Sequence, residues 1–297
     1  MATVRIAAAQ YPIDWFDGFQ AFEAKLARWV DEAADEGAQL LVFPEYAAME
    51  TVSLHGRDVT MSIPRSFEVM AELLPRIDAL HAELAARRKV HILAGSAVLT
   101  RDGGLPNVAR LITPKGSIGV QDKRTMTKGE RRDFHVTRGG PIRVFDTSLG
   151  LIGVSICYDI EFPLIARAQV KAGAKIILAP SYTETMAGYS RVRIGAMARA
   201  LENQCVTVQS PLVGTVDWSV TVDIASGRAG IYGPPDIGFP DDGVIAQGEM
   251  NRPQWVYGTA DYAAIDEVRR DGRVLNHAHW DEQDGAEVPV AEVVSLA

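Results

Sequence analysis

The sequence predicts an α/β fold with parallel strands, because one pattern occurs in two long stretches of the chain. Short apolar runs typical of buried strands alternate with segments whose apolar residues recur at helical spacing. The alternation occupies residues 4–94 and returns over residues 151–209. Such a pattern usually gives parallel neighbours joined by right-handed helical crossovers.

The first stretch begins with a strand at residues 4–9, followed by a helix that ends before Gly37. That helix is indicated by residues at helical spacing, namely Phe19, Phe22, Leu26, Trp29, Val30 and Ala33. A strand at 39–43, a helix around 70–84 and a strand at 90–94 complete the stretch.

Two hairpins are predicted in the middle of the chain. Residues 107–113 and 117–122 flank a proline-glycine turn at 114–116, which is a strong hairpin signal. A second turn, at 148–150, joins a strand at 142–145 to the apolar run that ends before Cys157.

The second alternating stretch follows Cys157, and the pattern weakens near the end of the chain. The expected elements are a helix at 163–172, a strand at 175–179, a helix at 190–203, a strand at 205–209, glycine- and proline-rich loops around short strands at 227–243, a strand at 255–260 and a helix at 262–270. No linker divides the chain, so we expect one domain over residues 1–272. Residues 273–297 are expected to form an extended tail, at a subunit interface.

The composition is that of a globular protein and argues against several classes. The chain has 297 residues, of which 47% are hydrophobic and 23% charged, so it can bury a sizeable core. Its net charge of -8 contains no basic block, which argues against nucleic acid as a partner. No segment resembles a signal peptide or a membrane span. We therefore expect a cytoplasmic protein with two reduced cysteines.

Three of the predicted strands end close to an ionisable side chain. Glu45, Lys123 and Cys157 follow the strands at 39–43, 117–122 and 151–156. Ligands of this architecture bind beyond the carboxyl ends of strands, so the three side chains are expected in one pocket. There a carboxylate would take the thiol proton, an ammonium group would stabilise negative charge, and the thiol would attack.

Each of these residues also has an ordinary interpretation. A cysteine at the end of an apolar strand is by default an inert core residue. Cys157, however, is expected where a strand turns sharply into a helix, whose N-terminus favours a thiolate. Glu45 and Lys123 would otherwise be surface charges, but the agreement of three strand ends favours a reactive site.

The motifs around these residues resemble those of the nitrilase, or carbon-nitrogen hydrolase, superfamily. The matching motifs are Phe43-Pro44-Glu45, Asp122-Lys123 and Cys157-Tyr158-Asp159-Ile160-Glu161-Phe162-Pro163, in order and spacing over residues 4–270. The resemblance implies a four-layer α-β-β-α sandwich, with two mixed sheets face to face, helices outside, and subunits that pair into a homodimer or higher homo-oligomer. It also implies a Glu-Lys-Cys triad and a second glutamate, for which Glu130 is the candidate and a solvated surface glutamate the alternative.

The resemblance further implies hydrolysis of a small amide through a cysteine thioester. The oxyanion would be held by Lys123 and the backbone N–H of Tyr158, and no metal or organic cofactor would be needed. The pair Tyr158-Asp159 is similar to the amidase and carbamoylase branches, whereas nitrile-hydrolysing branches usually have Trp-Glu. An aliphatic amide or N-carbamoyl substrate is therefore favoured over a nitrile.

Some positions leave the substrate open. Arg124-Thr125 and Leu164 depart from the family pattern, which usually has His-Leu and glutamate there. Tyr182, Thr183 and Glu184 follow the strand at 175–179 and are expected to line the pocket mouth. Glu184 would face either a substrate amine or solvent.

Other function classes remain as alternatives. A metal or redox protein would use Cys157, Cys205 and the pair His277 and His279, but no CxxC or HExxH spacing is present. A catalytically silent scaffold of the same fold has no physical need for a buried charge pair beside a thiol. An N-acyltransferase is the remaining option.

Overall fold

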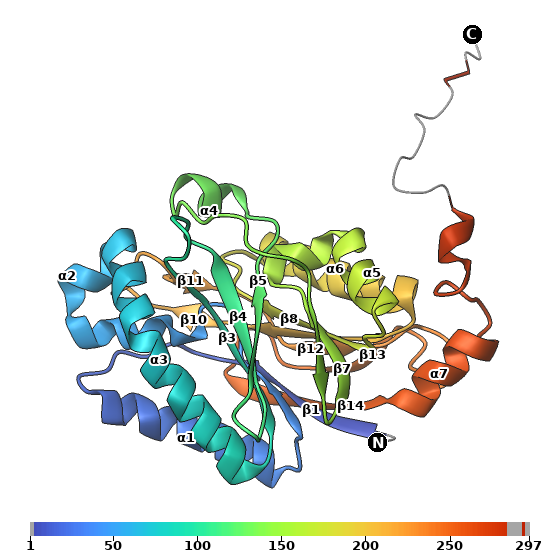
Figure 1. Cartoon of the computed structure of the whole chain (residues 1–297), viewed down its shortest axis with the longest axis horizontal. Helices are drawn as coiled ribbons and strands as arrows, with labels where there is room; N and C mark the ends of the chain where they lie inside the picture. Colours follow the sequence, from blue (N-terminus) through green and yellow to red (C-terminus); the bar gives the residue numbers. More distant parts are fainter. Residues whose placement is uncertain (1–2, 284–292, 295–297) are drawn as a thin grey trace.

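Two six-stranded mixed sheets form the centre of the computed structural model, which describes residues 3–283, 293 and 294 (Figure 1). In the first sheet the strand order is β14-β1-β2-β3-β4-β5. Its strands are β1 (Thr3–Gln10), β2 (Leu40–Val42), β3 (His91–Val98), β4 (Asn107–Ile112), β5 (Ile118–Asp122) and β14 (Gln254–Asp261). The neighbours β1, β2 and β3 pair in parallel, whereas β14, β4 and β5 extend the sheet antiparallel.

The second sheet repeats this plan in the order β13-β12-β9-β8-β7-β6. Its strands are β6 (Val144–Thr147), β7 (Gly150–Val154), β8 (Ile176–Ser181), β9 (Val206–Pro211), β12 (Gly230–Tyr232) and β13 (Val244–Gln247). Strands β7, β8 and β9 are parallel, and the outer strands are antiparallel. A small ribbon of β10 (Gly214–Thr215) and β11 (Ile224–Ala225) stands apart. Both predicted hairpins are confirmed, as β4-β5 and β6-β7.

The two sheets pack face to face through alternate residues of their strands. In β1, Val4, Ile6 and Ala8 belong to the core shared with the second sheet, while Ala7 and Ala9 belong to the core under the helices. Because each central strand is covered on both faces, its sequence reads as a nearly continuous apolar run. The hydroxyl of Ser210 adds a polar link, because its single proton is shared between the backbone oxygens of Ala9 and Val42, both at 2.8 Å.

Helices cover the outer face of each sheet. α1 (Phe19–Asp35) and α3 (Ile63–Arg88) lie on the first sheet, and α5 (Pro163–Lys171) and α6 (Met186–Asn203) lie on the second (Figure 1). The remaining helical segments are η1 (Ala47–His55), α2 (Arg57–Thr60), α4 (Lys128–Arg132), η2 (Cys157–Glu161), α7 (Tyr262–Asp271) and η3 (His279–Glu282). The predicted four-layer α-β-β-α sandwich is therefore confirmed.

Two helices begin earlier than the sequence pattern indicates. α3 starts at Ile63 rather than near residue 70, with Pro64 in its first turn, where a missing N–H costs nothing. α6 starts at Met186 because the hydroxyl of Thr185 accepts a hydrogen bond from the Gly188 N–H and caps the helix. In α3 the helical spacing of buried residues already includes Phe67, so the sequence-based start near residue 70 is too late.

The prediction of an extended tail is wrong for residues 273–283. This segment includes η3 and folds back on the same chain: the His277 N–H donates to Gln204 at 3.1 Å, and Arg167 stacks over the Trp280 ring. The rest of the predicted tail, residues 284–292 and 295–297, lies outside the described residues, apart from positions 293 and 294. The subunit interface and the boundary at residue 272 stay predictions. Within the part of the chain that the structure describes, no helix has the length and apolar character of a membrane span.

The packing between the sheets predicts a large cost for shortening Leu40. Leu40 is fully buried between the sheets, so Leu40→Ala is expected to lower the free energy of unfolding by about 2–5 kcal/mol. Val274 is 58% exposed, so Val274→Ala is the control and is expected to change it by less than about 0.5 kcal/mol. Urea unfolding at equal protein concentration measures both values. Equal effects of the two substitutions would contradict the two-sheet core.

Candidate active site

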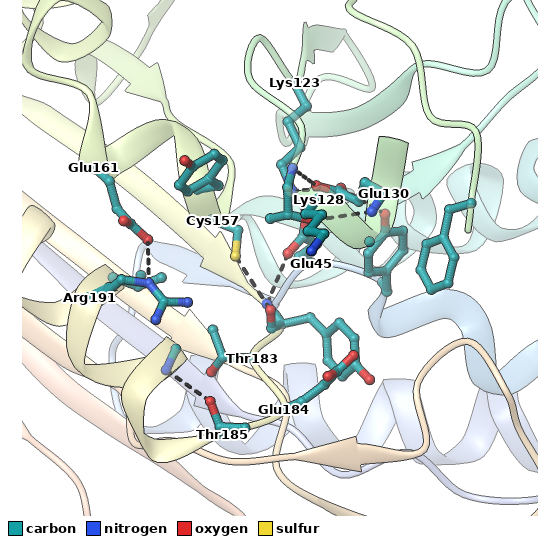
Figure 2. A pocket seen from close by; sticks show the side chains of 18 of the residues that line it. Glu45, Lys123, Lys128, Glu130, Cys157, Glu161, Thr183, Glu184, Thr185 and Arg191 are labelled. Carbon is teal, nitrogen blue, oxygen red and sulfur yellow. Dashed lines mark hydrogen bonds and ion pairs between the residues drawn. The ribbon is translucent and has the colours of Figure 1, made fainter. Parts of the chain in front are cut away.

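The structure brings Glu45, Lys123 and Cys157 together at one end of the two sheets (Figure 2). Glu45 follows β2, Lys123 follows β5, and Cys157 follows β7 as the first residue of η2. The three residues are 1%, 1% and 4% exposed. Lys123 Nζ lies 2.8 Å from Glu45 Oε1, and the Cys157 thiol is close enough for the charges of Glu45 and Lys123 to affect its pKa.

Backbone turns after β2 and β7 orient the side chains of Glu45 and Cys157. Tyr46 and Cys157 both have left-handed backbone angles, with φ of 59° and 49°. A non-glycine residue in this conformation costs of order 1–3 kcal/mol, and such residues cluster at functional sites. On the neighbouring strand, a Cβ at Gly95 would lie 2.1 Å from the Pro44 backbone oxygen. Glycine at position 95 therefore allows the segment that carries Glu45 to lie against β3.

Glu130 completes the charged centre and is 5% exposed, so the surface alternative is wrong. Its Oε1 accepts hydrogen bonds from Lys123 Nζ at 2.6 Å and from the Tyr46 hydroxyl at 3.1 Å. Its Oε2 accepts one from the Thr127 N–H at 2.8 Å, while the Thr127 hydroxyl caps the Glu130 N–H. This capping box on the short helix α4 fixes the carboxylate that the Lys123 ammonium needs.

Asn107, which the sequence analysis did not single out, links the parts of this centre. Its side-chain amide donates to Glu45 Oε1 at 2.9 Å and to Glu130 Oε1 at 3.4 Å. Its backbone oxygen accepts a hydrogen bond from the Lys123 N–H at 2.8 Å. In sequence it is only the polar first residue of a strand, which carries no signal of a role.

The two glutamates have opposite pKa shifts. Burial raises the pKa of Glu45, and the nearby Lys123 charge only partly offsets this. Burial also acts to raise the pKa of Glu130, but the charge and hydrogen bond of Lys123 with the hydrogen bonds from Thr127 outweigh it, so this pKa is lowered. Burial disfavours charged Lys123, yet Glu130 and Glu45 raise its pKa well above the usual range. Lys123 and Glu130 are therefore a fixed ion pair, and Glu45 is the more basic carboxylate.

The expected stabilisation of a Cys157 thiolate is wrong for the free protein. Burial, followed by the Glu45 charge, raises the pKa of Cys157 well above its ordinary value, against the opposing effect of Lys123. The segment that follows is a single short 3₁₀ helix, which offers little dipole to counter burial. Cys157 is therefore a neutral thiol, and its Sγ donates to the Tyr182 backbone oxygen at 3.4 Å (Figure 2).

A cavity of about 530 Å³ opens above the thiol. The predicted contact residues Tyr158, Tyr182, Thr183 and Glu184 all line it. The Tyr182 N–H donates to Glu45 Oε2 at 3.0 Å, and the Thr183 hydroxyl donates to the Ser226 backbone oxygen at 2.8 Å. The wall also holds charged side chains that the sequence analysis did not assign, namely Lys128, Asp133, Glu161 and Arg191. The roles of all these residues toward a ligand stay predictions.

The metal or redox alternative would use Cys205, His277 and His279 besides Cys157. Cys205 is fully buried, and its Sγ contacts the Arg199 backbone oxygen at 3.6 Å. His277 and His279 lie in the segment after α7, and both cysteines are free thiols. Across residues 3–283, 293 and 294, no group of three His, Cys, Asp or Glu side chains is arranged to hold a metal ion.

Comparison with known proteins agrees with this architecture. The sequence profile of a family described as carbon-nitrogen hydrolase matches residues 5–284. The chain belongs to the carbon-nitrogen hydrolase family. The resemblance to the nitrilase superfamily is thereby confirmed for nearly the whole length over which it was expected.

Individual members of the carbon-nitrogen hydrolase family show how far the likeness extends. A probable hydrolase of Bacillus subtilis, YhcX, is 35% identical over 272 residues, which cover 91% of this chain and 52% of that protein. The chain spans about half the length of the first curated relatives it matches. A carbon-nitrogen hydrolase from Helicobacter pylori G27 superposes with a TM-score of 0.72 at 20% identity, covering 91% of this chain and 92% of that one. An amidase from Nesterenkonia sp. AN1 gives a TM-score of 0.64 at 18% identity, covering 93% and 97%. These solved structures share the fold.

The site geometry predicts that alkylation distinguishes the two cysteines. Cys157 faces the cavity, whereas Cys205 is fully buried and burial raises its pKa to about 12. Iodoacetamide is therefore expected to modify Cys157 alone, at a rate that still rises with pH above the ordinary thiol pKa of about 8.5. Peptide mass spectrometry identifies the modified residue, and Cys205→Ser is the control. Modification of Cys205 first, or a rate that levels off near neutral pH, would contradict the described thiol environments.

Proposed function

We propose that this protein hydrolyses a carbon-nitrogen bond of a small amide or N-carbamoyl compound through a thioester on Cys157. The observation that carries the proposal is the buried Glu45 carboxylate, which is ion-paired with the Lys123 ammonium and lines the same cavity as the Cys157 thiol. A base, a cation and a nucleophile gathered in one cavity are the parts that acyl transfer requires.

In the first step, Glu45 accepts the thiol proton as Cys157 Sγ bonds to the amide carbon. The raised pKa of Glu45 suits it to this exchange with a thiol whose own pKa is raised. Lys123 Nζ already donates to Glu45 and Glu130, and an ammonium has three protons, so one remains for the developing oxyanion. The Tyr158 N–H, near the start of η2, supplies a second donor.

In the second step, Glu45 returns its proton to the leaving nitrogen. The carbon-nitrogen bond breaks, ammonia or an amine departs, and the acyl group stays on Cys157 as a thioester. A water molecule then gives its proton to Glu45 and its oxygen to the acyl carbon. The carbon-sulfur bond breaks and the acid leaves, while the proton on Glu45 returns to the Cys157 sulfur and restores the resting thiol.

A structural neighbour supports the nucleophilic role of the cysteine. One structure of the Nesterenkonia amidase carries the acetamide moiety of fluoroacetamide added covalently at the active-site cysteine. In the present chain the cavity above Cys157 also has room for a substrate larger than acetamide. We propose that Tyr182, Thr183 and Glu184 contact the part of the substrate that does not react.

Substitution of the central residues tests the proposed chemistry. Cys157→Ala is expected to abolish turnover of a panel of small amides and N-carbamoyl compounds, because no thioester forms. Glu45→Gln is expected to lower kcat by ~10²-fold to ~10⁴-fold, since it removes the general base but keeps the side-chain size. Cys205→Ser is the matched control and should retain activity. Full turnover by Cys157→Ala would eliminate the proposal.

The exposed carboxylate of Glu184 predicts a preference for substrates with a remote amine. Amine-bearing amides are expected to react faster than neutral amides of equal length. Glu184→Gln is expected to remove about 0.2–1 kcal/mol of that preference, because this is the typical energy of an exposed charge pair. The ratio of kcat/KM for a matched substrate pair measures it. A preference that survives the substitution would show that Glu184 faces only solvent.

A further inference from the structure

Asp159 connects the nucleophile turn to the lysine turn, although neither the triad nor the cavity includes it. It lies two residues after Cys157 in η2 and is 1% exposed. Its Oδ2 accepts a hydrogen bond from the Arg124 N–H at 2.9 Å, and its Oδ1 accepts one from the Thr125 N–H at 2.7 Å. These two amides directly follow Lys123, so one carboxylate joins the segments that carry two of the three central residues.

This connection spans the two sheets. Lys123 extends β5, the edge strand of the first sheet, whereas Cys157 follows β7 in the second. On its other side, the Lys123 backbone is held within the first sheet by the Asn107 backbone oxygen. The distance from the thiol to the ammonium therefore depends on a contact between sheets, and Asp159 supplies two charge-assisted hydrogen bonds to it.

We propose that Asp159 is a positioning residue that sets the placement of Cys157 relative to Lys123, a role that rests on the proposed amide hydrolysis for its effect on rate. The carboxylate suits this role because both of its oxygens accept, and two neighbouring N–H donors converge on it. An asparagine of the same size offers one accepting oxygen and turns an NH₂ group toward the other donor. A buried N–H without a partner then pushes the two turns apart.

Two substitutions at this position separate positioning from space filling. Asp159→Asn keeps the volume but loses an acceptor, and it is expected to lower kcat by about 10²-fold while KM stays within about threefold. Asp159→Glu keeps both acceptors and the charge but adds a methylene, and it is expected to retain more of the wild-type kcat than Asp159→Asn. A residue that only fills space would give the opposite order, which would overturn the proposal.

Asp236, which does not line the cavity and is less buried than Asp159, provides a control. Asp236 also joins two chain segments through its carboxylate, accepting from the Ile237 and Arg273 N–H groups and, at 3.3 Å, from the Val274 N–H. Asp236→Asn is expected to leave kcat unchanged. Equal losses of kcat in Asp159→Asn and Asp236→Asn, each normalised to the alkylatable Cys157 content, would show a general loss of structure and would overturn the positioning role.

A second measurement needs no substrate, so it distinguishes failure of this proposal from failure of the proposed function. The charged groups that act on the Cys157 thiol are Glu45, Lys123 and Glu130. If Asp159→Asn moves the thiol away from Lys123, alkylation of Cys157 at fixed, mildly alkaline pH becomes slower, because the thiolate loses its cation. Removal of a negative charge without movement would make alkylation faster. Slower alkylation supports the positioning role even if no amide is hydrolysed, and faster or unchanged alkylation overturns it.

Discussion

The Lys123 ammonium, shared by two buried carboxylates, is the interaction on which the rest of the site depends. Its Nζ lies 2.8 Å from Glu45 and 2.6 Å from Glu130. Two carboxylates this close to each other could not both ionise without a cation between them. The Lys123 charge and the hydrogen bonds from Lys123 and Thr127 outweigh burial at Glu130 and lower its pKa, whereas burial prevails at Glu45, which remains the carboxylate that can exchange a proton. Glu130 therefore serves as the ion-pair partner of Lys123, and Glu45 serves as the proposed base.

The two-sheet architecture explains how such a costly arrangement is held. Buried charges are tolerated only when their hydrogen bonds are satisfied, and here the partners come from β4, from α4 and from the turn after β8. Left-handed turns at Tyr46 and Cys157 direct the chain back immediately after two strands. The continuous apolar core between the sheets gives these turns a rigid base, so that the polar groups need only small adjustments to meet.

The sequence pattern predicted the strands and the residues at their ends, but not the contacts between residues far apart in the chain or the effect of burial on a pKa. Strand endings were enough to select Glu45, Lys123 and Cys157, because strand ends in this architecture converge. Asn107 and Asp159 were not selected as partners, since their contacts reach residues far away in the chain. The Cys157 pKa was predicted in the wrong direction because burial, the largest effect on it, cannot be read from neighbouring residues. Short helices such as α2 and α4 were missed because four or five residues show no periodicity.

The opposite pKa shifts of the two glutamates can be measured directly. Protein labelled with ¹³C at the glutamate carboxyl carbons would be titrated by NMR, with Glu45→Gln and Glu130→Gln used to assign the signals of these two residues and to distinguish them from that of buried Glu50. The account predicts that Glu45 titrates above the ordinary glutamate pKa of about 4.3 and Glu130 below it. The reverse order, or two glutamates that both titrate as exposed carboxylates do, would contradict the assignment of Glu45 as the base.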